Sequence, residues 1–240
     1  MKSQKGFVTV AFLSIFPLLI TAAFATYFCY SFLKSDLAAL NTCRSEQLET
    51  HNQVAKELKK LLRMNPKAVK LRIQEKLAEQ KLLLAITSGN PIAIAAAEVR
   101  LAQVKTLRLK LAFRQKVAIQ SANTKLKIAT YQISDSIKKA WNKHMQPMTP
   151  WISSRLEIRQ PHTPLLAVRP DFPDIAPVYE PVPNFEELQS WVHSWQLQLE
   201  IKSLHFNGRF QRSCATSLYL NKGDWLGRLK GGKHSSKHLF

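Results

Sequence analysis

The N-terminal part of the chain contains a long run without charge. Residues 6–33 carry no charged side chain between Lys5 and Lys34, and most of them are apolar. Roughly 20 apolar residues in a helix cross the hydrocarbon core of a bilayer, so this run is long enough to span one with some tilt. Tyr27 and Tyr30 are typical of the aromatic belt at a membrane surface. We therefore expect a single transmembrane helix over residues 7–33.

A cleaved secretory signal is an alternative interpretation of the same run. Such a signal has an apolar core of about 7–15 residues, followed by a small-x-small cleavage site. The core here is longer, and the small residues Ala23 and Ala25 lie inside it. A retained helix fits better, and an ordinary signal anchor is one form that it could take.

The first residues also follow a recognisable spacing. A short basic leader ends in Gly, a Pro stands eleven residues after that Gly, and two Leu follow the Pro. The residues in these places are Lys5, Gly6, Val10, Phe12, Pro17, Leu18 and Leu19. The pattern resembles the N-terminus of TadE/TadG-like pseudopilins, the type IV pilin-like proteins of tight-adherence (Tad/Flp) pilus systems. The resemblance covers about the first thirty residues and departs at Ala11, where the family usually has Glu.

The resemblance implies a processing site and a set of partners. A prepilin-type peptidase would cleave between Gly6 and Phe7, and the partners would be other membrane proteins of a pilus or secretion apparatus. The family's Glu neutralises the new N-terminal amine of a neighbouring subunit. Ala11 cannot do this, so the sequence is compatible with processing after Gly6 but does not support entry into a filament. The implied location is a bacterial inner membrane, with a cytoplasmic N-terminus and most of the chain periplasmic or extracytoplasmic.

The charge of the chain indicates anionic partners. Lys and Arg number 35 against 16 acidic residues, which gives a formal net charge of +19. Such an excess favours nucleic acid, lipid head groups or anionic envelope polymers. Basic residues are nearly balanced close to the two ends of the apolar run, so the positive-inside rule does not decide the orientation. The leader favours the N-terminus inside.

Three cysteines are present: Cys29, Cys43 and Cys214. Cys29 lies in the apolar run, where a small packing residue is expected. Cys43 and Cys214 would form a disulfide in an oxidising compartment and stay reduced in the cytoplasm. The sequence supplies no distance between them, so both outcomes stay open.

The region that follows the apolar run is predicted to be helical. Apolar residues recur at helical spacing from about residue 35 to residue 144, and Pro66 and Pro91 mark new helix starts. Gly89 is placed to end one helix, and the short turn after it favours an antiparallel hairpin. We expect a coiled-coil-like helical stalk over residues 34–146.

The longest of these helices is strongly basic. Arg108, Lys110, Arg114 and Lys116 fall within a short stretch of it, and Phe113 and Tyr131 are the aromatic residues nearby. One interpretation is a solvated helix surface. The other is a track that contacts DNA or another polyanion without sequence preference.

The last third of the chain changes in composition. Nine prolines between residues 146 and 184 disfavour helix, although residues 154–159 alternate as a strand would. Asn184 and Glu187 are expected to cap a short helix that runs through Trp191, a candidate core residue. Asn207-Gly208 is a strong hairpin signal. The predicted class is α+β: a transmembrane helix, a helical hairpin stalk, a Pro-rich connector and a small antiparallel β meander. The expected boundaries are 1–6 leader, 7–33 transmembrane helix, 34–146 stalk, 147–183 connector, 184–229 small α+β domain and 230–240 basic tail.

No motif in the sequence indicates an enzyme. There is no Gly-rich phosphate loop, no nucleophile elbow and no zinc-binding Cys or His pattern. We therefore expect no catalytic residues, no cofactor and no metal, and self-association stays open. Two functions are consistent with the sequence: a pseudopilin-like structural component of a pilus or secretion apparatus, or a membrane-anchored protein whose basic stalk holds DNA or an anionic envelope polymer.

Overall fold

The computed structural model describes residues 4–148, 152–159, 161–172, 176–201, 206–221 and 224–230. The chain forms two compact units. Unit 1 contains residues 1–43, 133–160 and 193–213, and unit 2 contains residues 44–132, 161–192 and 214–240. Each unit is therefore assembled from three separate stretches of sequence, so local sequence patterns alone do not define it.

Three long helices make up most of the chain: α1 (Gln4–Leu62), α2 (Asn65–Ser88) and α3 (Pro91–Met145). They confirm the expected mostly helical chain with a long apolar helix at its N-terminus. One difference from the expectation is that α1 runs without a break through residue 33, where the apolar run ends. The same helix therefore contains the apolar run and the first part of the predicted stalk.

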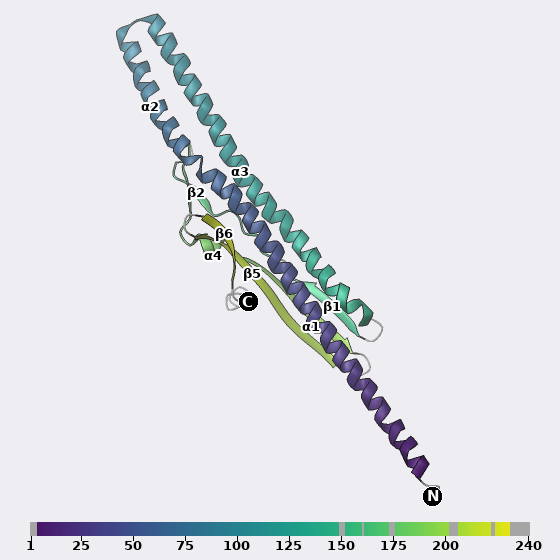
Figure 1. The fold of residues 1–240 in the computed structure, drawn as a ribbon. Coiled ribbons are helices and arrows are strands. Elements are labelled where there is room, and N and C mark those ends of the chain that lie inside the picture. Colours follow the sequence, from purple (N-terminus) through teal and green to yellow (C-terminus); the bar gives the residue numbers. More distant parts are fainter. Residues whose placement is uncertain are drawn as a thin grey trace. The chain divides into compact units, whose positions relative to one another are not determined.

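The turn between α2 and α3 follows the predicted rules. Gly89 ends α2 in the left-handed conformation with φ of 66°, and its N–H donates to Ile86 O (3.1 Å). Asn90 caps α3, because its Oδ1 accepts a hydrogen bond from Ile92 N (3.0 Å). The two helices run side by side from this turn (Figure 1). This confirms the antiparallel hairpin.

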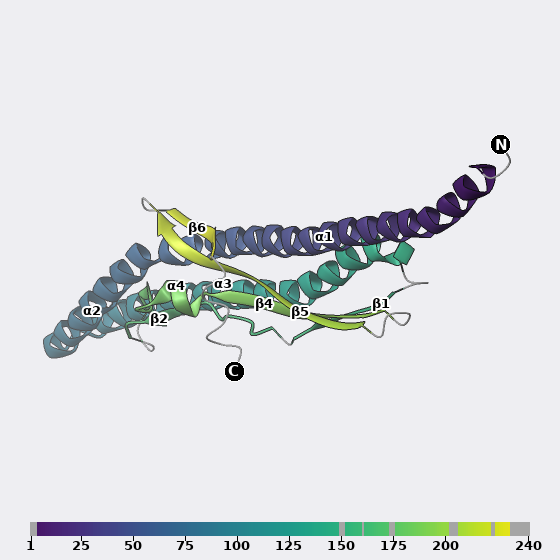
Figure 2. The ribbon, with the colours of Figure 1, turned by 90° about the horizontal axis from the view of Figure 1, so that it is seen from below.

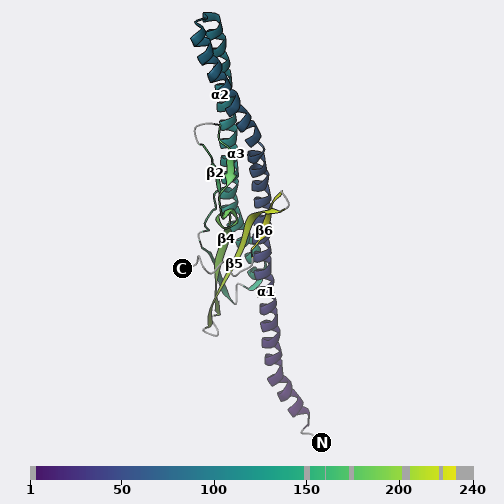
Figure 3. The ribbon, with the colours of Figure 1, turned by 90° about the vertical axis from the view of Figure 1, so that its left-hand side faces the viewer.

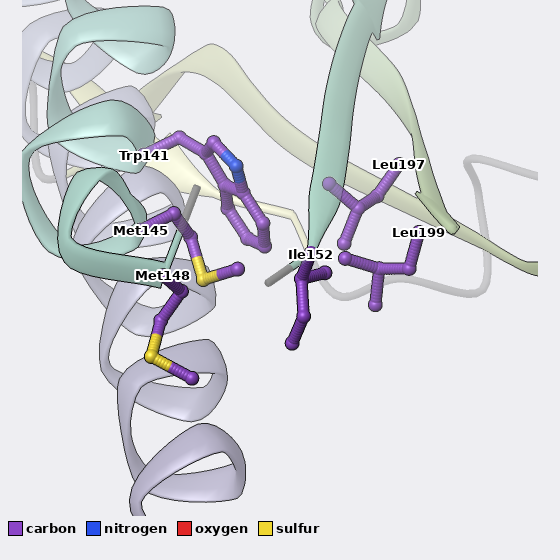
Figure 4. Close-up of a cluster of buried hydrophobic side chains, with 6 residues drawn as sticks. All are labelled: Trp141, Met145, Met148, Ile152, Leu197 and Leu199. Atoms are coloured by element: carbon purple, nitrogen blue, oxygen red, sulfur yellow. The ribbon is translucent and has the colours of Figure 1, made fainter. Parts of the chain in front are cut away.

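Unit 1 packs the end of α3 against a small antiparallel sheet. The strands are β1 (Ser153–Ile158), β4 (Trp191–Ile201) and β5 (Phe206–Asn221), and the short helix η1 (Gln146–Met148) follows α3. β1 pairs with β4 so that Leu156 lies opposite Leu197. In Figure 4, Trp141, Met145 and Met148 face Ile152, Leu197 and Leu199, and all six side chains are buried.

Unit 2 contains the remaining elements: β2 (Val168–Pro170), β3 (Tyr179–Pro181), α4 (Phe185–Leu188) and β6 (Asp224–Leu229). β2 and β3 form a two-stranded ladder, and β6 folds back on the end of β5 (Figure 2). The full strand order of the larger sheet is β1-β4-β5-β6. A buried cluster joins the two helices of the hairpin to the segment after β2, with Ala68, Leu71, Val104, Leu111 and Ala176 as members.

Hydrogen bonds from helix side chains hold the Pro-rich segment in unit 2. Asn65 pairs with the backbone of Tyr179 in both directions, at 2.8 Å and 3.0 Å. Gln115 Nε2 donates to Pro177 O at 2.9 Å. Proline carbonyls accept hydrogen bonds although proline has no N–H to donate, so the helices supply the donors that this segment lacks.

Three local predictions are wrong. Asn207 and Gly208 lie inside β5, not in a turn, because β5 begins at Phe206 and is paired with its neighbour β4 in the sheet. Asn184 does not cap α4 with its side chain, because it adopts the left-handed conformation with φ of 63°. Trp191 begins β4 instead of ending a helix, although it is fully buried as expected.

Replacement of Trp141 by alanine should lower the free energy of unfolding by about 3–5 kcal/mol, because the side chain is buried and leaves a cavity. Phe113→Ala is the matched control on the same helix, since its side chain is 69% exposed, and it should change stability by less than about 0.5 kcal/mol. Guanidinium unfolding of the full-length protein in one detergent measures both. Similar small changes for the two variants would contradict this core.

Candidate interaction surfaces

The apolar part of α1 is an exposed hydrophobic surface of unit 1. Leu13 and Leu18 are each 70% exposed, and every residue from 15 to 27 is exposed. In Figures 1 and 3, no other described element of unit 1 lies beside this purple end of the helix. Within the described part of the chain, one helix near the N-terminus is long and apolar enough to cross a membrane. This finding is consistent with a single-pass membrane protein.

The exposed segment of α1 ends where the helix begins to pack. Phe28 and Phe32 are half-buried against the core of unit 1, and Ser31 and Ser35 are buried. The Phe32 ring meets Trp141 edge-on at 5.6 Å between ring centroids. About 20 residues of helix precede Phe28, which corresponds to roughly 30 Å, the thickness of a bilayer core. The apolar segment therefore matches one crossing before protein packing starts.

A charged pair lies one helical turn beyond Phe32. Arg212 binds both carboxylate oxygens of Asp36, with Nε 3.2 Å from Oδ1 and Nη2 2.9 Å from Oδ2. Asp36 is buried, so the guanidinium supplies the charge that its carboxylate needs out of water. The pair ties α1 to β5 within unit 1.

The predicted cleavage residues lie in the first turns of α1. The backbone of Gly6 and Phe7 is helical there. Cleavage between these residues stays a prediction, since the helix conformation agrees with either a processed or an unprocessed chain.

The predicted basic face of α3 is only partly available to a ligand. Lys110, Arg114 and Lys116 are exposed, whereas Arg108 is half-buried. Arg108 Nη1 donates to both carboxylate oxygens of Glu75 on α2, at 2.9 Å and 3.1 Å. Glu75 is buried, so Arg108 balances its charge. The sequence predicted that Arg108 belongs to the basic face because its partner, Glu75, lies on another helix and cannot be recognised from the local sequence.

A hollow continues the basic face in the C-terminal direction along the part of α3 that belongs to unit 2. Its volume is about 430 Å³, and Lys116 is part of its wall. Tyr131 also lines it and is 68% exposed. The other lining residues are Ile119, Gln120, Asn123, Thr124, Lys127, Thr163 and Leu165. The α3 members recur at helical spacing, so one helix face was the signal that could have found them.

The three cysteines differ in exposure. Cys29 is exposed and free, whereas Cys43 and Cys214 are buried. Cys43 belongs to unit 1 and Cys214 to unit 2. A bond between these two thiols would join the units covalently, and the pairing stays a prediction.

Two titratable groups of unit 2 have strongly shifted pKa values. Arg72 makes two hydrogen bonds of 2.6 Å to Asp171 and so holds the pKa of that carboxyl well below its usual range. His51 is fully buried beside Trp191, with 5.5 Å between ring centroids. Burial lowers the pKa of His51 to about 4, because the charged imidazolium would lose its hydration. His51 is therefore neutral at pH 7.

Comparison with protein-family models, curated proteins and solved structures found no match. The surfaces described above therefore carry the functional argument.

The stability of unit 2 should fall in mild acid because of His51. An unfolded histidine has a pKa near 6.5, so between pH 6.5 and about 4 the unfolded chain binds a proton that the folded chain does not. The loss over this interval should be about 3 kcal/mol, and stability is full above pH 6.5. Guanidinium unfolding at pH 7.5 and pH 4.5 measures it.

Two variants isolate this effect. His51→Leu should remove most of the pH dependence between these two values, whereas His162→Gln should leave it unchanged, because His162 is exposed. An identical pH dependence in the wild type and in His51→Leu would show that another group is responsible.

Proposed function

We propose that this chain is a non-enzymatic, single-pass membrane component that holds a folded extracytoplasmic part at a bacterial inner membrane. The proposal rests on the change along α1 from exposed side chains at residues 15–27 to side chains that pack on the core of unit 1 from Phe28 onward. A helix that is continuous across this point couples the membrane segment directly to the core of unit 1. This is the arrangement that a structural subunit of an envelope assembly requires.

The N-terminal pattern narrows the proposal to a pseudopilin-like component of a Tad or type IV pilus-like or secretion apparatus. Lys5 and Gly6 before the apolar run support recognition by a prepilin-type peptidase. The N-terminus would then be cytoplasmic. Ala11 in place of the usual Glu favours a role beside other membrane proteins of the apparatus over a place inside a filament.

Processing tests this proposal directly. In cells with an active prepilin peptidase, the membrane-extracted protein should begin at Phe7, and mass spectrometry of its N-terminus should show this mass. Gly6→Leu should block cleavage, while Ser3→Leu, in the same leader, should not. An intact leader in the wild-type protein would overturn the pseudopilin-like role and leave an ordinary signal anchor.

A second candidate function is polyanion binding by α3. Lys110, Arg114 and Lys116 are exposed, and the exposed rings of Phe113 and Tyr131 lie on the same helix. Exposed aromatic rings among basic residues are typical of surfaces that bind single-stranded nucleic acid. Other anionic polymers of the envelope would meet the same charges.

Charge removal on α3 should weaken DNA binding by the full-length protein. Lys110, Arg114 and Lys116 changed together to Gln should lower affinity for all sequences alike and reduce the slope of log K against log salt by roughly 2–3. Arg108 is left intact because its loss would strand the buried Glu75 carboxylate. Filter retention or fluorescence anisotropy over a salt series provides the measurement.

The matched control removes the same charge elsewhere. Lys67, Lys70 and Lys76 are exposed on α2, and their change to Gln should have a much smaller effect. Equal effects of the two triple variants would show that binding depends on the net charge of the chain and not on the α3 surface. No binding at low salt would leave α3 as a solvated surface.

A further inference from the structure

The end of the α2–α3 hairpin is unusually apolar for a surface that faces water. Every residue from 82 to 97 is uncharged. Leu84 on α2 is 68% exposed and Ile92 on α3 is 80% exposed, the highest value among the large exposed hydrophobic residues. Leu83 and Ile86 are exposed as well. We call residues 82–97 the hairpin tip.

Packing between the two helices does not use these large side chains. Small residues lie between α2 and α3 at the tip, and they surround a hollow of about 300 Å³. It is lined by Ala78, Ala85, Ala93, Ala96, Ala97, Lys81 and Arg100. The four leucine and isoleucine side chains named above are each more than half exposed, so they contribute little to the hairpin core. Their exposure requires another explanation.

The polar groups at the turn have partners within the tip. The Thr87 hydroxyl donates to Leu84 O (2.9 Å), and the Ser88 hydroxyl donates to Ala85 O (2.7 Å). Asn90 Oδ1 accepts from Ile92 N, and Gly89 N donates to Ile86 O. Burial of a polar group in an apolar medium is costly unless the group is hydrogen-bonded. These hydrogen bonds therefore lower the free-energy cost of moving the turn from water into an apolar medium.

Basic residues flank the tip on both helices. Lys76 and Lys81 precede it on α2, and Arg100 and Lys105 follow it on α3, and all four side chains are exposed. They outnumber the acidic residues of the same stretches, since Glu75 is paired with Arg108 and only Glu79 and Glu98 are left. Basic residues beside an apolar surface are typical of segments that bind anionic membranes.

We propose that the hairpin tip inserts into the surface of a membrane that contains anionic lipids. Each arm of the tip has about eight residues, or roughly 12 Å of helix, which is less than half of a hydrocarbon core of 30 Å. The tip therefore enters one leaflet, and the basic residues reach the head groups. A second copy of the chain fits less well, because its basic residues would face those of the first. The proposal goes beyond anchoring by α1 and does not depend on it.

The test places a solvatochromic amino acid at Leu84 of the full-length protein in nanodiscs, with vesicles of the same lipid added. A second preparation carries it at Leu188 on α4, which is also exposed (52% against 68%) and lies outside the basic face of α3. With phosphatidylglycerol present, the emission at position 84 should shift to the blue and the emission at position 188 should not. With phosphatidylcholine alone, neither should shift.

Two further variants connect the shift to the proposed contacts. The double variant Lys81→Gln/Arg100→Gln should raise the vesicle concentration needed for the blue shift at position 84 by roughly tenfold. Added salt should have the same effect. Ile92→Ser should also raise this concentration, without a change of charge. Emission at position 84 that matches position 188 in all lipids would overturn the proposal. So would a blue shift that depends on protein concentration but not on lipid, which would indicate self-association.

Discussion

The packing of Phe32 on Trp141 is the contact on which unit 1 depends. It marks the place where α1 stops being an exposed apolar helix and becomes part of a protein core. Phe210 of β5 also meets the Phe32 ring, at 5.4 Å between centroids. One side chain of the helix therefore touches both the end of α3 and the sheet. The Asp36–Arg212 pair adds a directional contact just beyond it, so α1 is fixed to the sheet by apolar and by charged interactions.

Unit 2 uses a different means of stabilisation. Among its described residues, the Pro-rich segment forms one short ladder, β2 with β3, and it depends on hydrogen-bond donors from the helices. Arg72 illustrates this dependence, because it binds the Asp171 carboxylate, donates to Ala176 O (2.9 Å) and lies over the Phe172 ring. The conformation of this segment therefore depends on its contacts with the helices.

The sequence predicted the features that local rules decide. The hairpin turn was predicted correctly from Gly89 and Pro91, because a left-handed Gly typically ends a helix and Pro typically stands in the first turn of the next one. The features that depend on distant partners were not predictable. β1 was expected as a strand, but its pairing with β4 joins residues about forty apart. Asn207-Gly208 failed as a turn because strand pairing overrode a local preference, and Arg108 appeared free because Glu75 lies on another helix.

We propose that α1 leaves the membrane and enters the protein core at Phe28. A nitroxide moved along positions 15–37 of the protein in nanodiscs tests it through its accessibility to oxygen and to a water-soluble nickel chelate. Positions 15–27 should be uniformly accessible to oxygen and closed to nickel. From position 28 onward, accessibility should oscillate with the helical period, with minima near Ser31 and Ser35, which are buried positions of this face. Oscillation that begins before position 27, or uniform accessibility through position 37, would show that packing does not begin at Phe28.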